Sequence, residues 1–232
     1  MANIKLGGGI IDIRGSMAGN CFARNRFGNY MRAKTKPVNP NSTNQAKVRS
    51  IVAMLSQYWH DTMTAPVRAT WDAYAAAVAM KNRLGETVYL TGFNMFIRYC
   101  TIYNRQTGLM PAVGPAGTTL PEKDPTLSMT ALVSDQSIHV AFNDAAPWRS
   151  ITGSQMIMWL GQPQTATRNF FAGPWKLAGG ISAINPTPKT IAAPYTLVLG
   201  QKVWAYGRIC TGPTDCRLSE PMVISCLVTA AP

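Results

Sequence analysis

The chain is poor in the side chains that enzymes and metal sites use. Its 232 residues include 10 Asp and Glu and 2 His, whereas acid–base catalysis needs several titratable groups that converge on one pocket. No H-E-x-x-H, G-x-S-x-G, Walker or acidic calcium-loop pattern occurs. His60 ends an apolar helical pattern and His139 lies between apolar strand residues, so ordinary polar roles are expected for both. We expect no catalytic residue, no cofactor and no metal, and the chain is not predicted to be an enzyme.

Membrane and disulfide signals are also lacking. No apolar run approaches the roughly 18 residues that span a bilayer, and the start MANIKLGGGIIDIRG has no signal-peptide stretch. The 5 cysteines are odd in number and scattered, which argues against a disulfide scaffold. We expect a protein made in a cytoplasm, without a membrane partner.

Positive charge is abundant and unevenly distributed. The formal net charge is +12, and residues 1–50 hold nine Lys and Arg against Asp12 alone. The remaining residues hold thirteen cations against nine acids. A block of one sign predicts attraction to an anionic partner, such as nucleic acid or an acidic protein surface.

The basic block contains a hairpin pattern. The stretch NCFARNRFGNYMRAKT predicts two short strands around a turn at Asn25 to Gly28, and the two prolines that follow it end the second strand. Alternation along that strand would put its cations on one face. Three interpretations stay open: a solvated face, a phosphate-binding face, or a face that meets carboxylates of another copy. The candidate contact residues are Arg24, Arg26, Tyr30, Arg32, Lys34, Lys36, Lys47 and Arg49.

Apolar periodicity divides the rest of the chain. Residues 41–110 show helical spacing in three stretches, which begin at cap-like residues near Asn41, Thr64 and Thr91. Residues 111–125 are rich in proline and glycine and are expected to be a linker. Residues 126–232 contain short β-type runs separated by turn residues, which is typical of an antiparallel β-sandwich.

The predicted fold class is therefore α+β. It consists of an N-terminal β-hairpin arm and a small helical hub, followed by an antiparallel β-sandwich. The expected divisions are a glycine-rich basic arm (1–40), about three helices (41–110), a linker (111–125) and the sandwich (126–232).

The first half of the chain carries a resemblance. The order GNCFARNRFGNYMRAKTKPVNPNSTNQAKVR, then RATWDAYAA, then LTGFNMFIRYCTIYNRQTGL resembles a group of phage- and prophage-encoded proteins. In that group a glycine-rich hairpin passes through a basic, proline-containing segment into Trp-containing helices. The matching residues are Arg32, Pro37, Asn39, Pro40, Thr43, Gln45, Trp71, Gly92, Phe93 and Phe96.

The second half carries another resemblance. LVLGQKVWAYGRICTGPTDCRLSEPMVIS resembles the last two strands of a fibronectin type III or related immunoglobulin-like module, with one strand from Val203 to Cys210. Such modules commonly serve as adhesive or spacing units on virion and tail proteins. The resemblance implies a displayed β-sandwich.

Together, the two resemblances imply a virion structural protein of a tailed phage or related particle, in the capsid surface or the tail. We expect it to form a homo-oligomer and to assemble in many copies with itself and with other virion proteins through the basic arm. The alternative is a nonspecific nucleic-acid-binding protein whose arm contacts phosphates.

Overall fold

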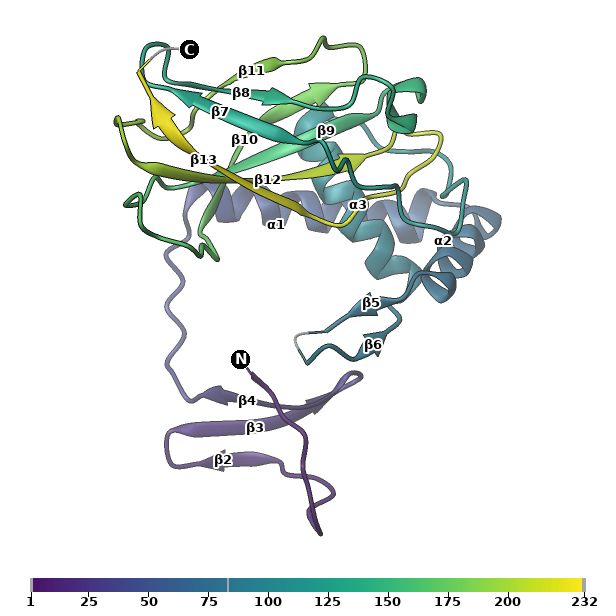
Figure 1. Ribbon diagram of the computed structural model, residues 1–232. Coiled ribbons are helices and arrows are strands. Elements are labelled where there is room, and N and C mark those ends of the chain that lie inside the picture. Colours follow the sequence, from purple (N-terminus) through teal and green to yellow (C-terminus); the bar gives the residue numbers. More distant parts are fainter. Residues whose placement is uncertain (1, 83, 231–232) are drawn as a thin grey trace.

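The computed structural model describes residues 2–82 and 84–230, and these residues form a mixed α and β architecture (Figure 1). A small sheet of N-terminal strands, here called the arm sheet, lies at one end of the molecule. Helices lie in the middle, and a large curved sheet lies at the other end. An extended segment, Lys34–Asn41, connects the arm sheet to the first helix and is called the arm linker.

The arm sheet is antiparallel, with strand order β1-β4-β3-β2. The predicted turn is confirmed: Asn25 pairs with Gly28, and the Asn25 side chain accepts a hydrogen bond of 2.9 Å from the Phe27 N–H. Gly28 has a φ of 114°, which explains why glycine follows this turn. The four strands are β1 (Ala2–Asn3), β2 (Gly15–Met17), β3 (Asn20–Asn25) and β4 (Gly28–Ala33).

The three predicted helices are confirmed within the described residues. Ser42 and Gln45 form a reciprocal capping box at the first helix, Thr91 caps the third, and Gly108 ends the third with a φ of 73°. A π-helical turn extends the first helix, and a two-stranded hairpin separates the second from the third. The elements are α1 (Thr43–Gln57), η1 (Tyr58–Thr62), α2 (Ala65–Ala77), β5 (Met80–Lys81), β6 (Thr87–Val88) and α3 (Gly92–Thr107).

The C-terminal half forms one sheet of 7 strands in the order β10-β9-β12-β13-β7-β8-β11. Its neighbours pair antiparallel, except that β13 and β7 run parallel with Val228 opposite Ala131. A short 3₁₀ helix, η2 (Pro147–Ser150), lies between β8 and β9. The strands are β7 (Ser128–Leu132), β8 (Ser137–Ala141), β9 (Gln155–Gly161), β10 (Trp175–Ser182), β11 (Lys189–Ala192), β12 (Lys202–Cys210) and β13 (Met222–Thr229).

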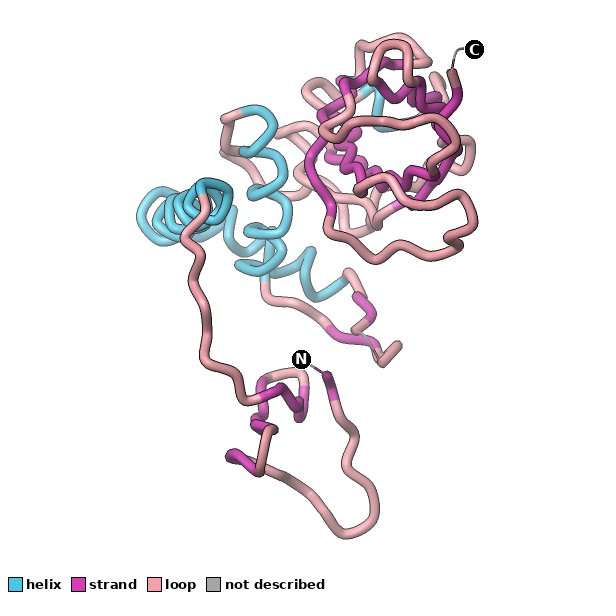
Figure 2. The backbone as a smooth tube through the Cα atoms, turned by 90° about the vertical axis from the view of Figure 1, so that its left-hand side faces the viewer, coloured by secondary structure: helices cyan, strands magenta, loops and turns pink. Residues whose placement is uncertain are grey.

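This sheet curls until its two edges approach each other (Figure 2). A Cβ added at Gly179 on β10 would lie 3.1 Å from Ile191 on β11, the opposite edge. The expected β-sandwich is therefore not confirmed, because the β13–β7 pair joins all seven strands into a single hydrogen-bonded order instead of two separate sheets. Inward-facing side chains fill the interior, among them Ile138, Met156 and Val203.

The helices and the curved sheet share a second core. Side chains of all three helices cluster with Ile157 and Trp159 of β9, which project from the outer face of the sheet. The Tyr99 hydroxyl of α3 donates a hydrogen bond of 2.8 Å to the Thr211 carbonyl, just after β12. The segment expected as a linker, 111–125, is fastened to this body, since the Ala116 N–H donates to the Asp215 carbonyl at 3.2 Å.

Within residues 2–82 and 84–230, every helix is too short or too polar to cross a bilayer.

Gly92 begins α3 at a point of close packing, which generates a stability prediction. A Cβ there would collide with the Asp72 carboxylate and lie 2.8 Å from the Trp71 carbonyl carbon. We expect Gly92→Ala to lower the free energy of unfolding by about 1–3 kcal/mol, measured by urea titration with tryptophan fluorescence. Gly19→Ala is the matched control, since no atom lies within 4 Å of its added Cβ. Equal unfolding midpoints for the two variants would contradict this packing.

Candidate functional site

The arm sheet has no core of its own. Among the described residues from Asn3 to Met54, none is buried, and the first buried residue is Leu55 in α1. Apolar arm side chains face water instead: Ile11 is 90% exposed and Met17 is 65% exposed. An antiparallel sheet becomes stable when a hydrophobic face packs against a second layer. The arm sheet therefore presents faces that a partner can cover.

Four of the predicted contact residues lie in the hairpin, at different places. Arg24 pairs with Asn29 and Arg32 pairs with Cys21, which puts the two arginines on opposite faces of the arm sheet. Arg26 lies in the turn between the strands. Tyr30 is half-buried and shares the face of Arg32. The hairpin thus carries cations on both faces and at its tip.

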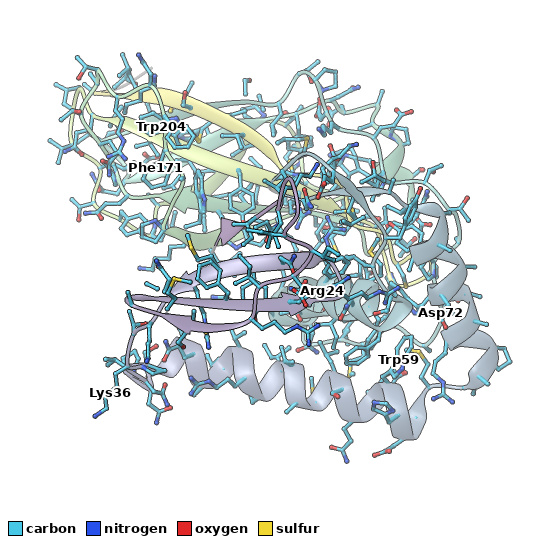
Figure 3. The ribbon with its side chains drawn as sticks, turned by 90° about the horizontal axis from the view of Figure 1, so that it is seen from below. Arg24, Lys36, Trp59, Asp72, Phe171 and Trp204 are labelled. Carbon is cyan, nitrogen blue, oxygen red and sulfur yellow. The ribbon has the colours of Figure 1, made fainter. Side chains whose placement is uncertain are left out.

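The strand that was expected to continue through Lys36 ends at Ala33. The Lys34 N–H still donates to the Gly19 carbonyl at 2.8 Å, but Lys36 already belongs to the arm linker. The expected single strand face of Tyr30, Arg32, Lys34 and Lys36 therefore does not extend to Lys36, because the strand pairing ends at Ala33 and the last backbone hydrogen bond is that of Lys34. Figure 3 shows Arg24 on the arm sheet and Lys36 on the arm linker.

The two predicted residues on α1 differ in their surroundings. Arg49 donates through its guanidinium to the Asn39 side chain at 2.9 Å and to the Asn41 side chain at 3.4 Å. It therefore fixes the end of the arm linker against the helix. Lys47 is exposed, one turn before the half-buried Ile51. Arg49 was predicted as a partner contact, and its role within the chain has no signal in the sequence.

Most of these cations have no counter-charge in the described part of the chain. Lys5 pairs with Glu86 at 2.6 Å and Arg14 pairs with Asp12 at 2.8 Å. The Lys5 ammonium, through its hydrogen bond, lowers the pKa of the Glu86 carboxyl. No carboxylate among residues 2–82 and 84–230 lies within 4.0 Å of the remaining cations of residues 1–50, which are Arg24, Arg26, Arg32, Lys34 and Lys36 of the arm and Lys47 and Arg49 of α1.

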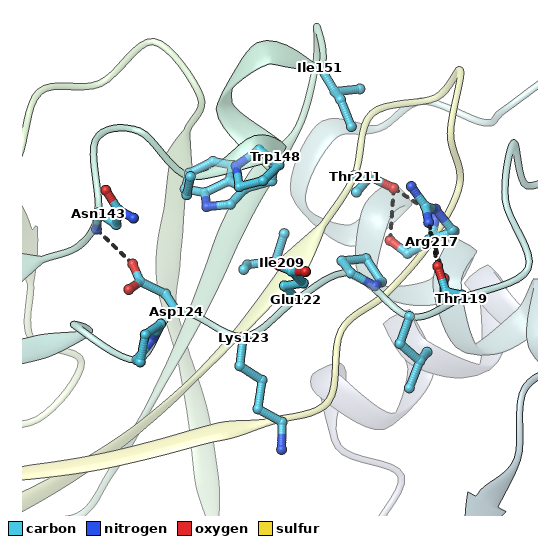
Figure 4. A pocket seen from close by; sticks show the side chains of 15 residues that line it. Thr119, Glu122, Lys123, Asp124, Asn143, Trp148, Ile151, Ile209, Thr211 and Arg217 are labelled. Carbon is cyan, nitrogen blue, oxygen red and sulfur yellow. Dashed lines mark hydrogen bonds between the residues drawn. The ribbon is translucent and has the colours of Figure 1, made fainter.

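A cavity of about 450 Å³ lies at the other side of the body (Figure 4). Three segments far apart in the sequence line it: 119–125, 143–151 and 209–217. Trp148 in its wall is 4% exposed, and its indole N–H has no acceptor among the described residues. Asp124 is also buried, and its carboxylate accepts from the Asn143 N–H at 2.7 Å. Sequence reasoning missed this cavity because only the folded chain brings its walls together.

A Ser–His–Asp cluster lies on the outer face of β8. His139 faces away from the buried Ile138 and Val140, as predicted. Its Nδ1 lies 2.9 Å from the Thr190 hydroxyl, and its Nε2 lies 3.1 Å from the Ser137 hydroxyl and 3.2 Å from Asp135.

In a catalytic relay the hydroxyl and the carboxylate use different ring nitrogens. Here Ser137 and Asp135 share one nitrogen, so the cluster ties β8 to β11 rather than forming a Ser–His–Asp relay. In the described part of the chain, no three His, Cys, Asp or Glu side chains gather as metal ligands.

Because the arm contributes nothing to either core, its removal should leave the body intact. We expect a chain that lacks residues 1–34 to unfold with a free energy within about 0.5 kcal/mol of that of the full chain, as is usual for changes away from buried contacts. Urea titration of both chains measures this difference. A loss of several kcal/mol would show that the arm helps to hold the body together.

Comparison with known proteins leaves the chain without an assigned family. No family model matches it, and no curated protein sequence matches it either. Function is therefore inferred from the arm, the arm linker and the cavity themselves.

Proposed function

We propose that the chain is a virion structural protein of a tailed phage or related particle, in the capsid surface or the tail. It assembles in many copies, with itself and with other virion proteins, through the basic arm. It is made in the host cytoplasm and ends in the virion. The observation that carries the proposal is the arm sheet itself, which has no buried residue among its described positions from Asn3 onward and is joined to the body by the arm linker and by the Lys5–Glu86 salt bridge.

The free energy gained by burying apolar side chains supports a role in which a neighbouring chain covers the arm sheet. Removing apolar surface from water contributes about 25 cal/mol per Å², and the arm leaves Ile11, Met17 and half-buried Phe22 without a covering layer. The outer strands β1 and β2 also present open edges, to which another chain can add a strand. Since the arm sheet is already paired internally, docking orders few additional residues.

In this proposal the curved sheet is a unit that is displayed on the particle or that spaces neighbouring subunits. Its last two strands carry the resemblance to a fibronectin type III-like module, and β12 and β13 pair antiparallel from Lys202 to Gly207. The outer faces of β7, β8 and β11 carry polar side chains such as Thr130, His139 and Thr190, while the helices cover the opposite side. The body can thus pack sideways or project while the arm makes the connection.

Arm-dependent assembly is the first test of the proposal. In sedimentation velocity over a concentration series, the full chain is expected to form oligomers, and the chain without residues 1–34, which loses the arm sheet and keeps most of the arm linker, is expected to need a higher concentration to assemble. Unchanged urea unfolding of the shortened chain is the control that its body is folded. A full chain that stays monomeric at every concentration and is absent from purified particles would count against the proposed function.

Nucleic-acid binding is a second candidate, favoured by the five arm cations without a counter-charge in the described part of the chain. It predicts duplex DNA binding with a steep salt dependence, at dissociation constants of about 10⁻⁴–10⁻⁶ M near physiological salt. Arg32→Glu combined with Lys34→Glu should abolish that binding in a fluorescence anisotropy titration. The control is Lys176→Glu combined with Lys189→Glu, which makes the same change in net charge at two lysines outside the arm. Undetectable binding of the unaltered chain at about 0.15 M salt excludes this candidate.

A further inference from the structure

We infer that the cavity beside Trp148 receives the arm linker of a second copy, so that neighbouring copies join head to tail. The cavity is the one defined above by segments 119–125, 143–151 and 209–217. This inference rests on the proposed function, because it names the surface that accepts part of the arm.

The arm linker has the form of a peptide ready for docking. Its Pro37-Val38-Asn39-Pro40 sequence has two prolines in a P-x-x-P spacing, which favours an extended polyproline II conformation with solvated backbone. Val38 is 86% exposed, and residues 35–38 make no hydrogen bond with other described residues. Arg49 holds the far end through Asn39 and Asn41. The segment is therefore open along its length and fixed at one end.

The cavity has the features that recognise such a peptide. Polyproline segments bind grooves lined by aromatic rings, and a tryptophan N–H in such a groove donates to a peptide carbonyl. Trp148 offers a buried N–H without an acceptor in the described part of the chain, beside the apolar Ile209 and Pro147. Leaving a buried donor unsatisfied costs about 1–3 kcal/mol, so a carbonyl from a docked chain would be retained there.

The charge of the cavity rim complements the arm linker. Five of the chain's 10 carboxylates lie around the cavity, and three of them are paired with Lys123, Arg149 and Arg217. Arg98 and Arg208 also act on Glu220. Glu122 is exposed and in no salt bridge with described residues, so Lys36 of the arm linker would meet this carboxylate. The rim carboxylates are Glu122, Asp124, Asp144, Asp215 and Glu220, and the cations are Lys123, Arg149 and Arg217.

A copy cannot fill its own cavity. The arm linker ends at the start of α1, whereas the cavity walls lie beyond the other end of that helix, around η2 and the loop that follows β12 (Figure 1). The occupant must therefore come from a neighbour. A contact between two different surfaces repeats from copy to copy and gives a ring when it closes or a filament when it does not.

A charge exchange tests the inference in the full chain. Lys36→Glu and Glu122→Lys each place like charges at the proposed contact, and each is expected to raise the concentration for half-assembly on the order of tenfold. Assembly should return in the double variant, and in an equal mixture of the two single variants. Lys189→Glu, on β11 outside the cavity lining, is the control. Sedimentation velocity measures all of these chains.

The outcomes separate the inference from the proposed function. If the unaltered chain assembles but the single variants assemble equally well, or if the double variant and the mixture fail to recover, the cavity is not the acceptor and arm-dependent assembly stands. If the unaltered chain never assembles, both fall.

Discussion

The packing of α3 against the outer face of β9 and β12 organises the whole body. Phe96 of α3 lies 5.3 Å from Trp59 and 5.5 Å from Trp71, measured between ring centroids, so one residue joins the other two helical segments. One turn further on, the Tyr99 hydroxyl reaches the Thr211 carbonyl. The sheet is therefore apolar on both faces beneath α3, whereas the outer faces of β7, β8 and β11 carry polar side chains such as Thr130, His139 and Thr190. The helices and the sheet depend on each other for burial.

Sequence reasoning succeeded where the structure is decided by near neighbours. The turn at Asn25–Gly28, the Ser42 capping box and the Gly108 helix end each involve residues within a few positions of one another. Closure of the large sheet is different, because it depends on β13 pairing with β7 across about 100 residues. The alternation of apolar and polar residues shows which side chains of a strand face the core, but it does not show which strands are neighbours in the sheet. That is why short strands were predicted correctly and their arrangement as a sandwich was not confirmed.

The same limit applies to the candidate site. Charge alone located the basic arm, but it could not show that Arg24 and Arg32 lie on opposite faces, or that Arg49 holds Asn39. These features depend on strand register and on where β4 ends. The cavity beside Trp148 had no sequence signal, because its walls come from segments separated by up to about 90 residues.

The charge distribution along the chain also bears on the symmetry of any assembly. In a two-fold dimer formed arm to arm, the same cations would face each other, with no acid from residue 13 to residue 60 to separate them. Like charges opposed at an interface are strongly unfavourable. Half of the carboxylates instead gather around the cavity, at the far side of the body from the arm linker. An asymmetric distribution of this kind favours a contact between unlike surfaces, which is the kind that repeats along a ring or a tube.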